Sequence, residues 1–159
     1  MPPPREPGRY SVALVCLGNI CRSPTAQVVL ADRVAVHSAG TGDWHVGDPM
    51  DARAAATLSA AGYDPSRHRA RVYDASWADA HDLVMAMDHQ NLADLGGRSE
   101  RVGLFRDLDP VGTGEDVPDP YYGGADGFAD VLTMVERTSD ALVAALAGAL
   151  DDRPAGSSA

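Results

Sequence analysis

Short apolar runs alternate along this chain with amphipathic or alanine-rich stretches, a pattern typical of a sheet layered with helices. The apolar runs predict four strands, at 11–16, 34–38, 82–87 and 101–104. The stretches between them predict helices, at 23–33, 51–61, 74–80, 88–95 and 127–150. Because strands and helices alternate, we expect a parallel α/β sheet with helices on both faces.

The helix predicted at 127–150 has the clearest periodicity. Its large apolar side chains fall on one face, and we interpret them as core: Phe128, Val131, Leu132, Val135, Leu142 and Leu146. The segment 105–124 is rich in proline, glycine and aspartate and predicts a loop. The ends at 1–9 and 151–159 predict flexible tails, which leaves a single domain over 10–150.

Composition narrows the possible partners. The formal net charge is -10 and the pI is about 4.7, which argues against binding to nucleic acid or to an anionic membrane. The two cysteines make neither a disulfide framework nor a zinc site. No apolar run is long enough to span a bilayer, and MPPPREPGRY lacks a signal-peptide core. We therefore expect a cytoplasmic protein.

The end of the first predicted strand carries the candidate chemistry. Residues 12–25 read VALVCLGNICRSPT, so Cys16 ends the apolar run and Arg22 follows six residues later. Ser23 and Pro24 favour a helix start, with the serine as N-cap. A loop between a strand and a helix N-terminus presents unpaired N–H groups to an anion, and the same field favours a thiolate.

This pattern predicts a phosphate cradle with a nucleophilic Cys16 at its floor, the alternative being an inert buried cysteine. Arg22 can hold two oxygens of a phosphate with its guanidinium fork. Asn19 tolerates left-handed backbone better than most residues. The phosphate loop (residues 16–23) thus consists of Cys16 and the binding residues Leu17, Gly18, Asn19, Ile20, Cys21, Arg22 and Ser23.

The run CLGNICRSP resembles the low-molecular-weight protein tyrosine phosphatase family, as do SAGTGDWH at 38–45 and DPYYG at 119–123. The resemblance covers about 10–150. It implies a four-stranded parallel sheet with the phosphate loop after the first strand. It also implies hydrolysis of phosphotyrosine in proteins or peptides through a phosphocysteine intermediate, with inorganic phosphate as product and neither cofactor nor metal.

The resemblance also assigns roles outside the phosphate loop. Asp119 of DPYYG would protonate the leaving oxygen and then activate water, with Asp116 as the local alternative. Tyr121 and Tyr122 would form one wall of the pocket, since two adjacent aromatic residues in a loop cannot both face a core. Trp44 would form the opposite wall, the alternative being a partly buried packing residue.

Further family positions would support the phosphate loop through side-chain hydrogen bonds. They correspond here to Asn19, Ser23, Ser38 and His68, with Asp88 behind the histidine. Ser23 would also donate to the Cys16 thiolate. The alternative interpretation of His68 is that it is an exposed loop residue. Cys21 would act as a redox partner that forms a disulfide with oxidised Cys16. We interpret the other histidines as structural or surface residues: His37, His45, His81 and His89.

Three other functions compete with this interpretation. An arsenate reductase would pass oxidation to cysteines further along the chain, and none follows Cys21. A protein-arginine phosphatase of the same family would carry threonine in place of Ile20 and lack the paired tyrosines. A non-catalytic phosphate-binding or thiol redox-sensor module would need neither Cys16 as nucleophile nor Asp119 as acid. The segment 22–38 is also shorter than the resemblance implies, and we expect the missing part at the end of the first helix.

Overall fold

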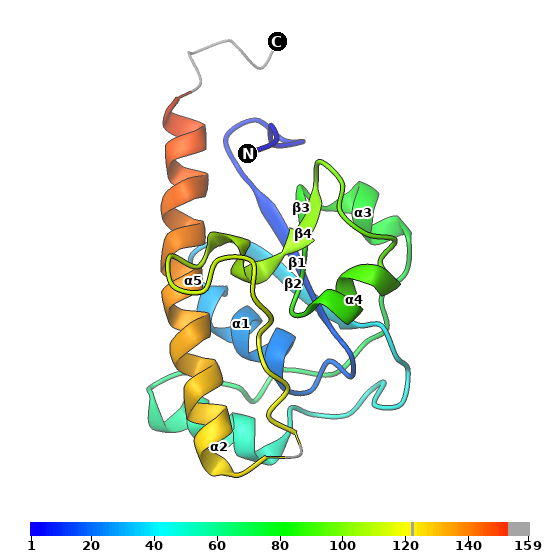
Figure 1. Cartoon of the computed structure of the whole chain (residues 1–159), viewed down its shortest axis with the longest axis vertical. Helices are drawn as coiled ribbons and strands as arrows, with labels where there is room; N and C mark the ends of the chain where they lie inside the picture. Colours follow the sequence, from blue (N-terminus) through cyan, green and yellow to red (C-terminus); the bar gives the residue numbers. More distant parts are fainter. Residues whose placement is uncertain (122, 153–159) are drawn as a thin grey trace.

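The computed structural model, which describes residues 1–121 and 123–152, contains a four-stranded parallel sheet (Figure 1). Its strands are β1 (Ser11–Cys16), β2 (Ala35–Gly40), β3 (Leu83–Ala86) and β4 (Val102–Leu104), in the order β2-β1-β3-β4. β1 lies between β2 and β3 and is buried over its last five residues. The predicted four-stranded parallel sheet is therefore confirmed.

Helices cover both faces of this sheet, as predicted. On one face, Val12 and Leu14 share a core with α1 (Arg22–Leu30), α2 (Ala52–Ala60) and α5 (Ala125–Asp151). On the other face, the smaller Ala13 and Val15 lie nearer to α3 (Ser76–Ala80) and α4 (His89–Asp94). The alternation of side chains along β1 thus divides the core into two layers.

The first helix starts earlier than the sequence suggested. α1 begins at Arg22 with Cys21 as its N-cap, and the N–H of Thr25 donates to the carbonyl of Cys21 at 3.1 Å. The prediction of Ser23 as N-cap is wrong, because its hydroxyl is bonded to other residues of the phosphate loop. The cap is thus backbone alone.

The segment 105–124 was predicted to be a loop throughout, and the structure corrects its first residues. Phe105–Leu108 forms a 3₁₀ helix, η1, and the side chain of Phe105 is fully buried. Because Phe105 packs into the core, it fixes the start of this segment. The many prolines and glycines of the segment do not indicate such a buried residue. α5 also begins two residues before the predicted start, after Gly124.

The short connection after α1 leaves the sheet intact. The N–H groups of Arg33 and Val34 both donate to the carbonyl of Leu30, at 2.8 and 3.2 Å, so the helix closes in one tight turn. β2 then pairs with β1 over six positions, with Ser38 opposite Leu14. Ser38 therefore keeps its place beside the phosphate loop, whereas the place of the missing length stays a prediction.

The N-terminal segment 1–9 lies against one end of the sheet. The backbone N–H of Arg5 donates to Asp82 at 2.6 Å, and the hydroxyl of Tyr10 donates to the carbonyl of Pro2 at 2.7 Å. The flexibility of this segment stays a prediction, and residues 153–159 of the C-terminal tail lie outside the described residues. Over 1–121 and 123–152, no helix combines the length and apolarity needed to cross a membrane.

Candidate active site

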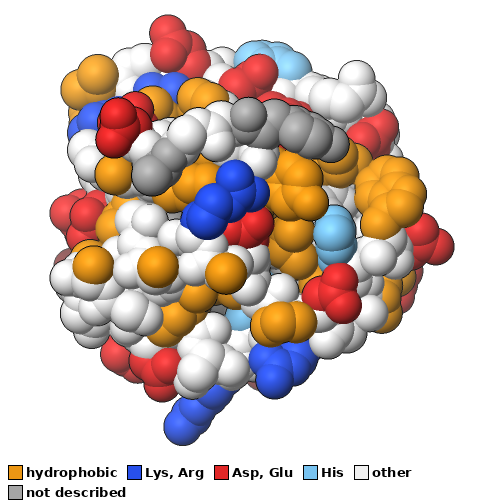
Figure 2. All heavy atoms as spheres, turned by 90° about the horizontal axis from the view of Figure 1, so that it is seen from below, with side chains coloured by type: hydrophobic (Ala, Val, Ile, Leu, Met, Phe, Trp, Pro, Cys, Tyr) orange, Lys and Arg blue, Asp and Glu red, His pale blue; other side chains and the backbone are white. Residues whose placement is uncertain are grey.

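A pocket of about 330 Å³ opens at the carboxyl end of β1, where ligands bind in open α/β sheets. Figure 2 views the end of the molecule where α2 lies, and it shows hydrophobic side chains gathered beside single basic and acidic ones. The pocket is lined by Cys16, Leu17, Gly18, Ile20, Cys21, Arg22, Trp44, His45, Asp119 and Tyr121. The predicted phosphate loop and the predicted acid therefore meet in one cavity.

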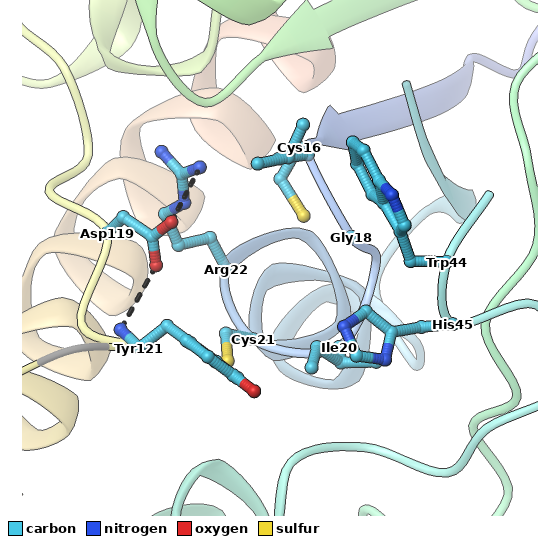
Figure 3. Close-up of a pocket in the computed structure, with 10 residues that line it drawn as sticks. Cys16, Gly18, Ile20, Cys21, Arg22, Trp44, His45, Asp119 and Tyr121 are labelled. Atoms are coloured by element: carbon cyan, nitrogen blue, oxygen red, sulfur yellow. Dashed lines mark hydrogen bonds and ion pairs between the residues drawn. The ribbon is translucent and has the colours of Figure 1, made fainter. Parts of the chain in front are cut away.

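Cys16 forms the floor of this pocket. It is the last residue of β1, and its Sγ points into the space between Asp119 and Trp44 (Figure 3). The Oγ of Ser23, at the first turn of α1, lies 2.9 Å from this sulfur. Ser23 is completely buried, so its hydroxyl is fixed where it can donate to a thiolate.

Asn19 holds the phosphate loop in shape from behind. Its backbone φ is 56°, the left-handed conformation expected for an asparagine here, and its side chain is 0% exposed. The side-chain amide donates to Ser23 and Ser38, each at 2.9 Å, while its oxygen accepts from the N–H of Arg71 at 3.0 Å. The loop support predicted from Asn19, Ser23 and Ser38 is thus assembled around one side chain.

His68 contacts the same asparagine through the backbone. Its Nε2 lies 2.6 Å from the carbonyl oxygen of Asn19, so it donates there. Burial lowers the pKa of His68, against the effect of this hydrogen bond, and the nearby Arg71 and Arg69 lower it further. The imidazole therefore supports the loop as a neutral donor at neutral pH, and it is not a free surface side chain.

Arg22 spans the back of the pocket with a buried guanidinium. Its Nη1 donates to Asp88 at 2.7 Å and to the carbonyl of Val117 at 3.0 Å, while its Nη2 lies 3.7 Å from Asp119 (Figure 3). Burial would lower the pKa of Arg22, but the charges of Cys16, Asp88 and Asp119 raise it above its ordinary value. The arginine is thus a fixed cation beside the sulfur.

Asp88 supports the loop by another route than the one predicted. Its carboxylate accepts from Arg22 and, as N-cap of α4, from the N–H of Asn91 at 2.7 Å. Among the described residues His68 makes no hydrogen bond to Asp88, so placing Asp88 behind His68 was wrong. Asp88 lies two residues after the end of β3, where it reaches Arg22 and orients the arginine.

The two candidate acids are separated by the structure. Asp119 lines the pocket, is 39% exposed at its side chain, and accepts from the N–H of Tyr121 at 3.1 Å. Asp116 accepts from the backbone N–H of His89 at 2.8 Å and is not in the lining. Asp119 is therefore the carboxylate that can reach a ligand above Cys16.

The walls of the pocket are apolar and lie opposite one another. Tyr121 stands on the side of Asp119, and Trp44 stands across the cavity (Figure 3). Trp44 is 70% exposed, so it is a wall at the mouth and not a packing residue. Its ring lies on Gly42, where a Cβ would come within 1.8 Å of a ring carbon. Tyr122 lies outside the described residues.

His45 is a lining residue that the sequence analysis placed among structural or surface residues. Its ring covers Gly18, and its Nδ1 lies 3.1 Å from the Asp48 carboxylate, which directs the opposite edge of the ring toward the cavity. Its position directly after Trp44 in SAGTGDWH was the available signal. His37 and His81, whose ring nitrogens lie 3.0 Å apart, do not line the pocket.

Cys21 also lines the pocket, and both it and Cys16 are buried free thiols. Burial, together with the neighbouring charges of Asp51 and Cys16, raises the pKa of Cys21 to about 12. At neutral pH, in the reduced protein, Cys21 is therefore a protonated thiol. In the part of the chain that the structure describes, no group of three or more histidine, cysteine or acidic side chains is arranged to hold a metal ion.

The family model for low molecular weight phosphotyrosine protein phosphatases matches residues 11–151. The chain belongs to this family. Its members are cysteine-dependent hydrolases of phosphotyrosine that react through a phosphocysteine intermediate. The resemblance inferred from CLGNICRSP and DPYYG, with the fold and enzyme class that it implied, is confirmed.

Individual relatives match over most of their length. A low molecular weight protein-tyrosine-phosphatase of Streptomyces coelicolor is 42% identical over 92% of this chain and 99% of that protein. A protein tyrosine phosphatase of Entamoeba histolytica, crystallised with Hepes in the active site, superposes with a TM-score of 0.81 at 30% identity, covering 88% of this chain and 98% of that one. Vibrio vulnificus Wzb in complex with benzylphosphonate gives 0.78 at 26% identity, covering 87% and 100%.

Proposed function

We propose that this chain removes phosphate from phosphotyrosine in proteins or peptides, with Cys16 as nucleophile, Arg22 as oxyanion clamp and Asp119 as general acid and base. The observation that supports this most directly is the pocket itself. A cysteine at the end of a strand forms its floor, and one carboxylate and one aromatic ring stand on the same side above that floor.

In the first step the Cys16 thiolate attacks phosphorus and the bond from phosphorus to the tyrosyl oxygen breaks. Arg22 and the N–H groups of the phosphate loop stabilise the charge on the equatorial oxygens. Asp119 donates its proton to the departing oxygen, so tyrosine leaves as a neutral phenol. The hydroxyl of Ser23, 2.9 Å from the sulfur, stabilises the thiolate before attack and as a leaving group afterwards.

In the second step Asp119 has become a carboxylate and accepts a proton from water. The oxygen of that water attacks phosphorus, the sulfur–phosphorus bond breaks, and inorganic phosphate leaves. Protons and charges balance over the two steps, because the proton that Asp119 gives in the first returns in the second. The chain's own residues suffice for both.

The walls favour an aryl ester over a guanidinium. Ile20, Leu17 and Tyr121 present apolar surface to the cavity and offer no paired acceptors for a phosphoarginine side chain. The Vibrio vulnificus relative is in complex with benzylphosphonate, in which a methylene group joins a phenyl ring to a phosphonate. The alternative is a protein-arginine phosphatase with the same Cys16 chemistry.

The test is phosphate release from peptides of one sequence that carry either phosphotyrosine or phosphoarginine, with Cys16→Ser as the blank. We expect release from the phosphotyrosine peptide alone. Release from the phosphoarginine peptide would keep the Cys16 mechanism and overturn the assignment of the pocket. Release from neither would leave a phosphate-binding or redox module as the function.

We also propose that Cys21 protects Cys16 from permanent oxidation, in a cytoplasm that keeps both thiols reduced. Peroxide oxidises the Cys16 thiolate to a sulfenic acid, and the Cys21 thiol then attacks that sulfur to form a disulfide and water. Wild-type activity should return after a thiol reductant is added, whereas the Cys21→Ser variant should lose activity irreversibly. Equal recovery of both proteins would remove the role.

A further inference from the structure

The proposed acid lies in a loop whose tip has little backbone support. At residue 117 the loop is firmly held, because the N–H of Val117 donates to the carbonyl of Met87 at 2.7 Å and its carbonyl accepts from Arg22. Beyond it, Pro118 and Pro120 flank Asp119 and lack N–H groups. Within the acid loop (residues 117–121), the carbonyl of Pro120 accepts from the N–H of Gly123 at 3.0 Å, and a side chain that donates to another loop carbonyl adds to this short turn.

Arg53, in the first turn of α2, makes that contact. Its Nη2 donates to the carbonyl of Tyr121 at 2.9 Å. Its guanidinium also lies over two rings, 5.4 Å from the centre of Tyr121 and 4.6 Å from that of Phe128 in α5. The side chain is 44% exposed and outside the pocket lining. It thus contacts the acid loop without lining the pocket itself.

Arg53 is itself oriented by the cap of α2. The carboxylate of Asp51 accepts from its Nε and Nη2, at 3.3 and 3.1 Å, and from the backbone N–H of Arg53 at 2.9 Å. These hydrogen bonds lower the pKa of Asp51 despite its burial, so the pair is ionised at neutral pH. The guanidinium fork is therefore presented to Tyr121 in one orientation.

The same aspartate reaches the phosphate loop. The backbone N–H of Asp51 donates to the carbonyl of Ile20 at 2.9 Å. A continuous path of contacts therefore runs from Ile20 through Asp51 and Arg53 to Tyr121. The N–H of Tyr121 in turn donates to Asp119, the last contact of the path, which Figure 3 shows. The path ties the loop that would carry the acid to the loop that would carry the nucleophile.

We propose that Arg53 is a positioning residue for the general acid: by holding the carbonyl of Tyr121 it sets the place of Asp119 above Cys16. This inference rests on the proposed function. It predicts a loss specific to protonation of the leaving oxygen, because the hydrogen bonds of the Arg53 side chain go to Asp51 and Tyr121, while its charge acts within the phosphate loop on the Cys21 thiol and not on the Cys16 nucleophile. Substrates with acidic leaving groups, which depart without a proton, should be insensitive to Arg53.

The experiment compares kcat/KM for phenyl phosphate, which needs the acid, with that for 2,4-dinitrophenyl phosphate, which does not. In Arg53→Met, an unbranched side chain still covers Phe128 while the charge and donors are lost. We expect a loss of about tenfold on phenyl phosphate and less than about twofold on the dinitrophenyl ester. Arg53→Lys should recover part of the loss, since one ammonium cannot serve Asp51 and Tyr121 as a fork does.

The matched control is Arg98→Met, which removes another exposed arginine that pairs with an aspartate. Arg98 is 54% exposed at its side chain and bonds to Asp107, away from the pocket lining. Its kcat/KM should stay at the wild-type value on both esters. The inhibition constant for inorganic phosphate should be unchanged in both Met variants, which shows that the phosphate loop is folded.

A double-mutant cycle decides between positioning and an independent contribution. If Arg53 acts through Asp119, then Asp119→Ala with Arg53→Met should be no slower on phenyl phosphate than Asp119→Ala alone. Additive losses, equal losses on both esters, or no loss in Arg53→Met would each overturn the inference. If Asp119→Ala itself shows no difference between the esters, the acid assignment in the proposed function fails, and that outcome is distinct from a failure of Arg53.

Discussion

The phosphate loop and the acid loop stand a few side chains apart and are supported in opposite ways. The phosphate loop is held by completely buried side chains, Asn19 and Ser23 above all, whose polar groups bond to one another. The acid loop carries a half-exposed Asp119 and is held by an exposed Arg53. The part that would bind the anion is thus built into the core, whereas the part that would supply the proton depends on contacts that solvent can reach and weaken.

The largest expected effect is the loss of the nucleophile. Cys16→Ser should lower turnover of phosphotyrosine by about 10,000-fold or more, because a hydroxyl here has no general base to activate it. The cradle around it should persist, since Asn19 and Arg22 are untouched. Phosphate binding measured by calorimetry should therefore stay close to wild type. A variant that loses turnover and binding together would show that the loop depends on the sulfur for its shape.

The next effect is that of the acid. Asp119→Ala should lower kcat/KM for phenyl phosphate by about 100-fold to 10,000-fold, the usual contribution of general acid catalysis. The loss should shrink as the leaving group becomes more acidic. The measurement is a series of aryl phosphates at one pH. If the loss is the same along the whole series, Asp116 becomes the residue to test.

A smaller effect is expected for the buried support. Asn19→Gly keeps the left-handed backbone accessible but removes the side-chain hydrogen bonds, so unfolding should need about 1–3 kcal/mol less and kcat/KM should fall about tenfold. Asn19→Ala should be worse still, because alanine disfavours a φ of 56°. Urea unfolding and steady-state kinetics measure both. A glycine variant as stable and active as wild type would contradict the contrast between the loops.

The smallest effect on turnover is expected for Asp109, at the start of the segment that leads to the acid loop, where a substitution should act mainly on stability. Buried Asp109 accepts from Arg137 at 2.7 and 2.8 Å and from Arg106 at 2.9 Å. The hydrogen bonds from Arg137, and then those from Val111 and Arg106, hold the pKa of Asp109 well below its ordinary value despite burial.

Because the native pKa of Asp109 is depressed, its stabilisation is complete above the ordinary carboxyl pKa and is lost as the pH falls toward the native one. Asp109→Asn should therefore lower the free energy of unfolding by about 2 kcal/mol at pH 7. The gap to wild type should narrow in urea titrations at about pH 3. A gap that does not change with pH would show that shape, and not charge, fixes this segment.

Features that depend on neighbours in sequence could be predicted. The strand, loop and helix start around Cys16 occupy one short stretch, and their residue types report the anion site directly. The left-handed Asn19 and the capping role of Asp51 follow from local preferences in the same way. The roles of Asp119, Ser38 and His68 came from the family resemblance; Asp119 lines the pocket and the other two are hydrogen-bonded to Asn19, while the roles themselves stay predictions.

Features that depend on which segments meet in space could not be predicted. Asp88 bonds to Arg22 across 66 positions, and Arg53 reaches Tyr121 across 68, so no local pattern marks either pair. His45 shows no ligand spacing in the sequence, and its place in the pocket lining depends on a loop that meets Gly18 from a distant part of the chain. The fully buried Phe105 lay in a segment whose composition indicated only loop.

The ring of Trp44 lies directly on the backbone of Gly42, so the residue type at position 42 controls where this wall of the pocket can stand. A single methyl group at position 42 would occupy the place of the ring and force the wall of the pocket to swing away. The position of the Trp44 wall therefore depends on the absence of a Cβ at Gly42, whose own N–H donates to the carbonyl of Leu17 at 2.9 Å. Selection can widen or narrow the range of accepted substrates at this position while the reaction machinery stays fixed.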